Sequence, residues 1–397
     1  MDVCSDLRVL DLTRILGGPY ATMLLADLGA DVVKVEPPGG DPVRRTPPFY
    51  ADSESEPYGG YFMSINRGKR SIELDLTTDT DQELFLSLVE TADVVVENFQ
   101  TGTMERFGLE YERLKELNPG LIYASIRGFG DPRTVPTDRQ GDPVYDIVVQ
   151  ALSGVMQING QPDDPPTKFG IGIGDLFAGV MCTVGVLAAL HQRDQTGEGQ
   201  YVDISMYDCM VSLCERTIYQ YSYEGTVPAR YGNAHPLLFP YDAFETKDGL
   251  VVIGVISGAQ WTTLCEVMGL PELGAAYADQ EHRNANREML REIIAEWTRR
   301  RTSEEVLAAL EGEIPCAPVQ DVTDVFADPV VRERGMLVEV DQPGVDVPLT
   351  IAGNPIKMTG SAVGVRGRAP LLDEHREELL ATLQLRADVA STGTGKR

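Results

Sequence analysis

A carboxylate that follows a glycine-rich turn is the strongest chemical feature of this sequence. Residues 170–175 read GIGIGD, so three glycines alternate along the chain just before Asp175. Glycine allows a bulky ligand to approach the backbone closely and permits positive φ. The small-residue run at 176–190 predicts a helix, whose N-terminal N–H groups and dipole would stabilise a carboxylate as the anion. Asp175 therefore suits a nucleophile, although an ordinary N-cap aspartate gives the same pattern.

Other reactive arrangements are missing from the sequence. The four histidines, at 191, 235, 282 and 375, are far apart, and the six cysteines form no CxxC pair. These spacings do not indicate a dedicated metal site. The sequence also lacks a GxSxG elbow and a GxGxxG turn after the first expected strand, which disfavours a serine hydrolase and a dinucleotide enzyme.

Alternating strands and helices must position Asp175. Pro19 suits a helix start because its missing N–H costs nothing there, and Gly29 closes the helix expected over 20–28. Further helices are expected over 81–91 and 176–190. Short apolar runs predict strands at 7–12, 32–36, 71–76, 94–97, 121–126 and 201–205. Strands that alternate with helices indicate a parallel sheet covered on both faces, in an α/β fold.

The second half of the chain indicates a smaller domain. Composition shifts toward Tyr, Pro and Gly from about residue 219, and a hairpin at 243–255 and amphipathic helices at 288–299 and 303–311 follow. We expect a large domain over 1–215, a linker over 216–240 and a small domain over 241–330. Residues 331–397 would return to complete the large domain, with a helix at 373–383 and a frayed last dozen residues.

The net charge of the chain indicates which partners it would repel and which habitat it suits. The chain has 61 acidic residues against 34 basic ones, a net charge of −27, and only seven lysines. Such a surface repels nucleic acid and anionic membranes. We also see no signal peptide and no uninterrupted apolar run of about 18 residues. The composition resembles that of halophile proteins, and we expect a cytoplasmic protein with reduced thiols.

A series of motifs covers nearly the whole chain in order. They are LDLTRILGGPYATMLLADLGADVVKVEPPGGD (10–41), NRGKRSIELDL (66–76), ADVVVENFQTGTMERFGL (92–109), YASIRGFG (123–130), YDIVVQALSGVM (145–156), GIGIGDLFAGV (170–180), TGEGQYVDISMYD (196–208), GNAHP (232–236) and RAPLLDEH (368–375). The series resembles the class III CoA-transferases, the group that contains formyl-CoA transferase and carnitine CoA-transferase. This resemblance implies a large doubly wound Rossmann-like domain, a smaller α/β domain and an interlocked ring homodimer.

The resemblance also implies a mechanism and a set of site residues. Asp175 matches the nucleophilic aspartate, which forms a mixed anhydride and then an aspartyl–CoA thioester. Backbone N–H groups of residues 172–174, or of a glycine-rich loop at 254–258, would stabilise the oxyanions. No ATP, metal or tightly bound cofactor is needed, because CoA enters as part of the substrates. CoA-binding positions are Ile15, Leu16, Leu74, Asn98, Phe99, Arg106 and Tyr145, and substrate positions are Tyr61 and Tyr145.

Departures from the family pattern bear on the substrate. Pro143 stands where formyl-CoA transferase has a lysine, Pro37 or Pro38 replaces an arginine near the adenine end, and Leu16 replaces a glutamine beside the substrate. These changes argue against formyl and oxalyl groups. With the halophile-like composition, we expect an acyl-CoA donor such as succinyl-CoA and a small dicarboxylate acceptor such as mesaconate. Itaconate, malate, citramalate and an intramolecular CoA shift stay open.

Two other functions fit less well. An α-methylacyl-CoA racemase of this family has a histidine before the stretch that begins at Tyr145, where this sequence reads Gly141-Asp142-Pro143. One proton-transfer partner would then be missing. A non-catalytic CoA-binding protein is disfavoured because Asp175 is present.

Overall fold

The apolar runs pair into one parallel sheet with the strand order β3-β2-β1-β4-β5-β6. The computed structural model describes residues 2–49 and 58–393, which divide into two units. Unit 1 draws on residues 1–154, 169–215 and 330–397 and contains this sheet. Its strands are β1 (Arg8–Asp11), β2 (Asp31–Glu36), β3 (Arg70–Glu73), β4 (Val94–Glu97), β5 (Ile122–Arg127) and β6 (Tyr201–Ser205). The expected α/β fold with a parallel sheet is confirmed.

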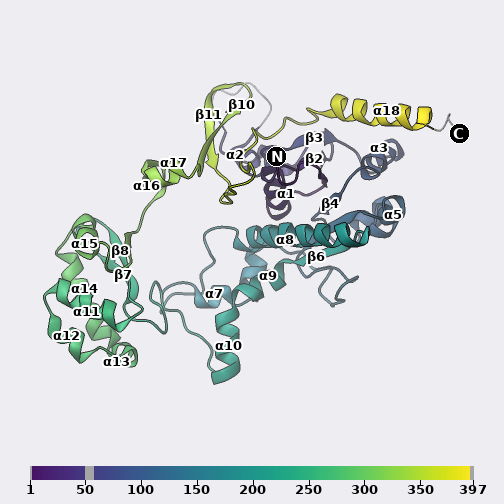
Figure 1. The fold of residues 1–397 in the computed structure, drawn as a ribbon. Helices are drawn as coiled ribbons and strands as arrows, with labels where there is room; N and C mark the ends of the chain where they lie inside the picture. The colour runs from purple at the N-terminus through teal and green to yellow at the C-terminus, as the bar shows by residue number, and fades with distance from the viewer. Residues whose placement is uncertain (1, 50–57, 394–397) are drawn as a thin grey trace. The chain divides into compact units, whose positions relative to one another are not determined.

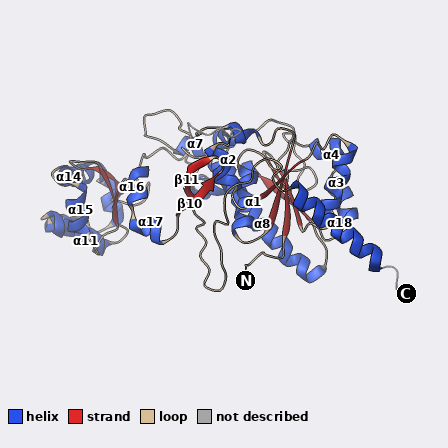
Figure 2. Cartoon of the chain, turned by 90° about the horizontal axis from the view of Figure 1, so that it is seen from above, coloured by secondary structure: helices blue, strands red, loops and turns tan. Residues whose placement is uncertain are grey.

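Helices cover both faces of this sheet (Figure 2). On one face Phe85, Leu114 and Leu379 pack on strand residues such as Leu10 and Val95, and on the other α8 packs against α1 and β5. The helices of unit 1 are α1 (Gly17–Asp27), α2 (Gly60–Asn66), α3 (Asp79–Val89), α4 (Thr103–Phe107), α5 (Tyr111–Leu117), α6 (Asp146–Leu152), α8 (Ile173–Thr196), α9 (Met206–Leu213), α17 (Pro329–Glu333) and α18 (Arg376–Gly393), with a 3-10 turn at Pro42–Arg45.

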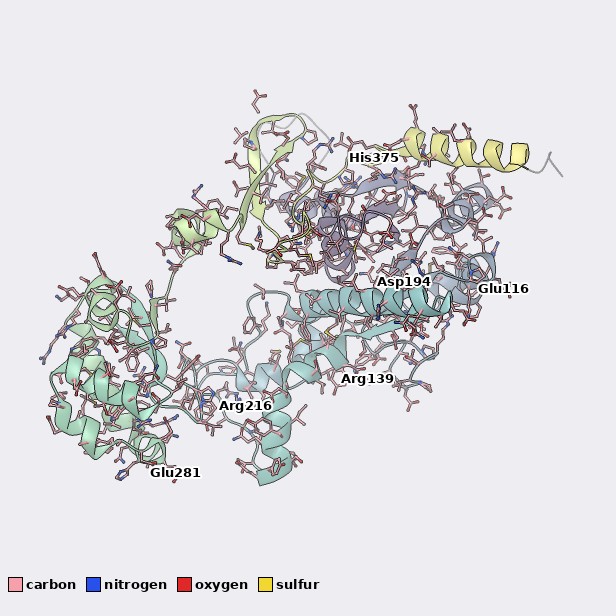
Figure 3. The ribbon with its side chains drawn as sticks, in the orientation of Figure 1. Glu116, Arg139, Asp194, Arg216, Glu281 and His375 are labelled. Atoms are coloured by element: carbon pink, nitrogen blue, oxygen red, sulfur yellow. The ribbon has the colours of Figure 1, made fainter. Side chains whose placement is uncertain are left out.

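The C-terminal segment returns to unit 1. Strands β10 (Leu337–Gln342) and β11 (Val345–Ala352) form an antiparallel hairpin, and Val340 and Ile351 pack against Phe62 of α2. His375 lies just before α18 (Figure 3) and accepts a hydrogen bond from the backbone N of Ser71 in β3 at 3.2 Å. Residues more than 300 positions apart therefore share one core.

Unit 2 contains residues 155–168 and 216–329. An antiparallel sheet of β7 (Tyr241–Glu245), β8 (Leu250–Gly254) and β9 (Cys316–Pro318) packs with helices around the buried Trp261, Leu290 and Val306. Its helices are α7 (Val155–Ile158), α10 (Glu215–Glu224), α11 (Gly258–Met268), α12 (Pro271–Ala276), α13 (Gln280–Ala285), α14 (Arg287–Arg299), α15 (Ser303–Leu310) and α16 (Val322–Ala327) (Figure 1). The domain bounds expected at residues 215, 240 and 330 stay a prediction.

Two predicted helices differ from the structure by more than three residues at their C-terminal ends. Helix α8 spans Ile173–Thr196 rather than 176–190, because the turn before Asp175 already contributes helical residues. Among the described residues it is the one helix long and apolar enough to cross a membrane by length and composition, although it packs against α1 in unit 1. Helix α18 spans Arg376–Gly393 rather than 373–383. The fraying expected over the last dozen residues stays a prediction. The last four residues of that prediction lie outside the described part of the chain.

Candidate active site

The site forms where the order of the sheet reverses. Strands β1 and β4 are neighbours, but the chain leaves them toward opposite edges of the sheet. A crevice opens at the carboxyl ends of such strands, where ligands bind in doubly wound folds. The side chain of Asn98, just after β4, accepts from the backbone N of Arg14 and donates to its carbonyl, both at 2.8 Å. This pair of hydrogen bonds joins the two loops that line the crevice.

A cavity of about 190 Å³ occupies this crevice. Its lining brings together Asp175 and five of the residues predicted from the sequence. These five are Ile15, Leu16, Asn98, Phe99 and Tyr145. A second cavity, of about 180 Å³, is lined by Leu74, Pro37, Pro38 and Phe99. Phe99 therefore lies in the walls of both cavities.

Asp175 lies in the first turn of α8 but does not cap it. Gly172 occupies the N-cap position with no side-chain cap bond, and Asp175 is the third helical residue. The plain N-cap interpretation is therefore wrong. The N-terminus of α1 meets this turn closely: a Cβ on Gly17 would lie 2.9 Å from the backbone O of Asp175. Glycine is required at position 17 because of this contact.

The environment of Asp175 favours its protonated form. Burial, together with the nearby carboxylate of Asp146, raises the pKa of Asp175 from 3.8 to about 6. The helix N-terminus was expected to favour the anion, but burial and like charge outweigh that effect here. At neutral pH Asp175 is still mostly ionised, and it is poorly solvated, which suits a nucleophile.

Asp146 supports the turn that carries Asp175. It lies in the first turn of α6, accepts from the backbone N of Gly174 at 2.8 Å and accepts from Gln150 at 2.7 Å. The backbone N of Ile173 donates to the carbonyl of Ile171 at 2.9 Å. Two of the three N–H groups expected to stabilise oxyanions at 172–174, those of Ile173 and Gly174, are thus already engaged within the protein.

Buried charged side chains form hydrogen bonds with the backbone of the loop between β1 and α1. Ile15 has a φ of 69°, which a β-branched residue rarely adopts, so the neighbouring contacts must fix it. Asp11 accepts from the backbone N of Thr13 at 2.9 Å, and Lys34 donates to the Thr13 carbonyl at 2.8 Å. Asp11 also pairs with the fully buried Lys69 at 2.8 Å. This group, Asp11, Lys34 and Lys69, is called the buried charge network below.

The buried charge network stays ionised at neutral pH. Burial opposes the charge on Asp11, but Lys69 and Lys34 lower its pKa to about 2. Burial lowers the pKa of Lys69 to about 8, although Asp11 opposes this change. Both members of the pair are therefore charged at pH 7.

Two predicted residues lie outside the linings of the two cavities. Tyr61 of α2 is partly buried, and its pKa is raised by burial and then by the charges of Asp175 and Asp41, so it lies within electrostatic reach of Asp175. Arg106 of α4 donates to Thr103 at 2.9 Å and is exposed. Tyr145, at the N-cap of α6, is 68% exposed at the mouth of the larger cavity.

Reasoning from the sequence missed Asp146, Arg14 and Arg127. Asp146 directly follows Tyr145 in the YDIVVQ motif, and Arg14 directly precedes Ile15, so adjacency was the available signal. Arg127 ends β5, lines the larger cavity and pairs with Glu97 at 2.7 Å. Asp142 also lines the larger cavity and pairs with Arg139 (Figure 3) at 3.0 Å.

The residues at the site suit covalent catalysis by a carboxylate. Within residues 2–49 and 58–393, no group of three or more His, Cys, Asp or Glu side chains could hold a metal ion. The arrangement places the partly buried carboxylate of Asp175, with the carboxylate of Asp146 nearby, at a cavity of small volume. Such a carboxylate can attack an activated acyl group and form a covalent intermediate.

Comparisons with known proteins agree with this arrangement. A model described as CoA-transferase family III matches residues 4–376. A succinyl-CoA:mesaconate CoA-transferase of Haloarcula hispanica is 62% identical over 395 residues, covering 100% of this chain and 98% of that protein. One of Haloarcula marismortui is 63% identical over 380 residues, with 96% of each chain covered. The crystal structure of a CAIB/BAIF family protein from Brucella suis superposes with a TM-score of 0.84 at 38% identity, covering 95% of this chain and 98% of that one.

Proposed function

The chain belongs to CoA-transferase family III, whose members move CoA between carboxylic acids, and on that premise we propose that it transfers CoA from succinyl-CoA to mesaconate through Asp175. The observation that carries the proposal is the partly buried carboxylate of Asp175, with its raised pKa, in the wall of the cavity at the β1–β4 crevice. The names of two relatives at 62% and 63% identity supply the donor and the acceptor.

The chemistry follows from the carboxylate. The Asp175 oxygen attacks the thioester carbon of succinyl-CoA, and the CoA thiolate leaves, which gives a mixed anhydride. The thiolate then attacks the Asp175 carbonyl carbon, which releases succinate and leaves an aspartyl–CoA thioester. Mesaconate attacks this thioester, the thiolate leaves again, and the thiolate finally attacks the mesaconyl carbon. The last step returns Asp175 as the free carboxylate, so the thioester bond is conserved without ATP.

Oxygen labelling tests this sequence of bonds. The acceptor oxygen that attacks the aspartyl thioester becomes the bridging oxygen of the second anhydride and stays on Asp175. With mesaconate carrying ¹⁸O in its carboxylates, we expect the peptide that contains Asp175 to gain one label after a single turnover. The matched control is the same peptide after incubation with labelled mesaconate but without succinyl-CoA. No label on Asp175 while mesaconyl-CoA forms would overturn the covalent mechanism.

Transfer assays test the reaction class. In molar KCl, we expect wild-type protein to convert succinyl-CoA and mesaconate to mesaconyl-CoA without net hydrolysis, and Asp175→Ala to form none. Itaconate, malate and citramalate as alternative acceptors test the substrate. No transfer to any acid, together with exchange of the α-proton of a branched acyl-CoA, would instead support a racemase.

We further propose that the protein is a homodimer in the cytoplasm. Helix α10 in unit 2 has no buried residue and exposes Ile218, Tyr219, Tyr221 and Tyr223. Helix α8 in unit 1 exposes Val184. Apolar side chains gathered on one helix usually mark an interface, and a second copy of this chain fits the interlocked dimer that the family resemblance implies. Light scattering should give twice the chain mass of 43.4 kDa, and a monomer at micromolar concentration would refute the dimer.

A further inference from the structure

Arg14 is fixed from two sides at the crevice. Its backbone N and carbonyl are both held by the Asn98 amide at 2.8 Å, and its guanidinium lies over the Phe99 ring at 4.8 Å from the centroid. Both contacts come from the segment just after β4. The direction of the side chain is therefore set before any ligand binds, which lowers the entropy lost on binding.

Within the described residues, no carboxylate forms an ion pair with the guanidinium of Arg14. Its Nε is buried without a hydrogen bond, and no described carboxylate lies within the 4.0 Å that defines an ion pair. Burial lowers the pKa of Arg14, with a smaller opposing effect from Asp41. Arg127, by contrast, is matched by Glu97 and Asp131. A partly buried cation without a counter-charge is costly unless an anion binds to it.

Arg14 lines both cavities, and no other cationic side chain described in the structure does so. The larger cavity holds Asp175, where the thioester must react. The smaller cavity lies beyond Phe99, and its lining includes the carboxylates Glu36 and Asp75. Arg14 therefore supplies the positive charge where the two cavities adjoin.

We propose that Arg14 binds the diphosphate of coenzyme A, an inference that rests on the proposed function. In CoA the diphosphate lies between the nucleotide and the pantetheine arm that ends in the thiol. A molecule with its thioester at Asp175 and its nucleotide in the smaller cavity places that diphosphate beside Arg14. A planar guanidinium donates two parallel hydrogen bonds to a phosphate, which an ammonium group does not reproduce.

The positions around Arg14 strengthen this assignment. Pro37 and Pro38 line the smaller cavity, and Pro143 lies beside the Asp142 and Val144 of the larger one. None of these prolines carries charge. On a chain with a net charge of −27, a bound anion such as CoA needs a local cation to offset the field. The succinyl carboxylate is a second anion that a guanidinium could bind, but it would lie with the acyl group beside Asp175.

Binding measurements test the assignment. We would measure the Kd of CoA by calorimetry on the full chain for wild type, Arg14→Gln, Arg14→Lys and, as a control, Arg300→Gln, which removes an exposed arginine of unit 2. Losing charge-assisted hydrogen bonds should weaken CoA binding about 10- to 100-fold in Arg14→Gln. Arg14→Lys should be intermediate, and Arg300→Gln should match wild type.

A substrate without phosphates isolates the effect. With succinyl-pantetheine as donor, kcat/KM should be equal in wild type and Arg14→Gln, whereas with succinyl-CoA it should fall about 10- to 100-fold in the variant. Equal CoA affinity in wild type and Arg14→Gln would overturn the proposal. A loss with succinyl-pantetheine but not with butyryl-pantetheine would overturn it too and assign Arg14 to the acyl carboxylate. Wild-type protein that binds no CoA would refute the proposed function itself.

Discussion

Replacing the nucleophile should make the protein more stable while it abolishes activity. In Asp175→Asn the side chain keeps its size but loses its charge, and therefore the effect of burial and of Asp146 on that charge. The difference between a pKa of about 6 and the ordinary 3.8 corresponds to about 3 kcal/mol, because each pH unit is worth about 1.4 kcal/mol. This is an upper value, since Asp175 keeps some contact with solvent.

The pH dependence of this gain has a defined sign. The folded protein holds the Asp175 proton more tightly than the unfolded chain does, because its pKa is raised. The charge of Asp175 therefore does not lower the free energy of unfolding below pH 3.8. It lowers that free energy increasingly between pH 3.8 and about 6, and by its full amount above pH 6. The advantage of Asp175→Asn should be near zero at the acid end and largest at pH 7.5.

Urea unfolding at fixed KCl and protein concentration measures the effect. We expect Asp175→Asn to exceed wild type by up to about 3 kcal/mol at pH 7.5 and by clearly less at pH 4.5. The matched control, Asp138→Asn, removes an exposed aspartate on the 128–145 loop and should stay within about 0.5 kcal/mol of wild type. The reasoning would be refuted if Asp175→Asn and wild type had the same free energy of unfolding, if the variant were less stable, or if the difference did not depend on pH.

Three further substitutions test two neighbours of Asp175 and the buried charge network. Asp146→Asn removes the like charge beside Asp175, whose pKa is raised to about 6, so the acidic limb of the pH–rate profile should lie at lower pH in the variant than in wild type; an unmoved limb would assign the raised pKa to burial alone. Gly17→Ala places a Cβ 2.9 Å from the backbone O of Asp175, and the shift this forces should lower kcat about tenfold or more in the transfer assay; unchanged kcat would show that the helices can separate freely. Asp11→Asn leaves Lys69 buried without its partner, and thermal or urea unfolding should show a loss of about 3–5 kcal/mol; a loss under 1 kcal/mol would show that Lys69 simply deprotonates.

The sheet was predictable because its strands are short apolar runs separated by helices. Residues 94–97 and 201–205 were predicted with the bounds that β4 and β6 have. The start of α8 was missed because Gly170, Gly172 and Gly174 read as a loop, whereas helical residues begin at Ile173. Propensity alone does not show that contacts with Asp146 and α1 hold this turn in place.

The roles of Arg14 and Asp146 could not be predicted because they arise from distant neighbours. Arg14 meets Asn98 across 84 residues, and Asp146 meets Gly174 across 28. The direction in which the pKa of Asp175 shifts could not be predicted from the sequence either. A helix start lowers it and burial raises it, and only packing decides which effect is larger.

The buried charge network has a consequence for life in brine. At molar salt, electrostatic attraction between exposed charges decays over about 3 Å, so pairs on the surface lose most of their strength. Asp11 and Lys69 are both fully buried, and dissolved ions cannot reach between them. The loop that carries Arg14 and Ile15 therefore keeps its shape whether the surrounding solution holds little or much salt. Salt concentration would then change how strongly the protein binds its substrates, but it would not change the structure of this loop.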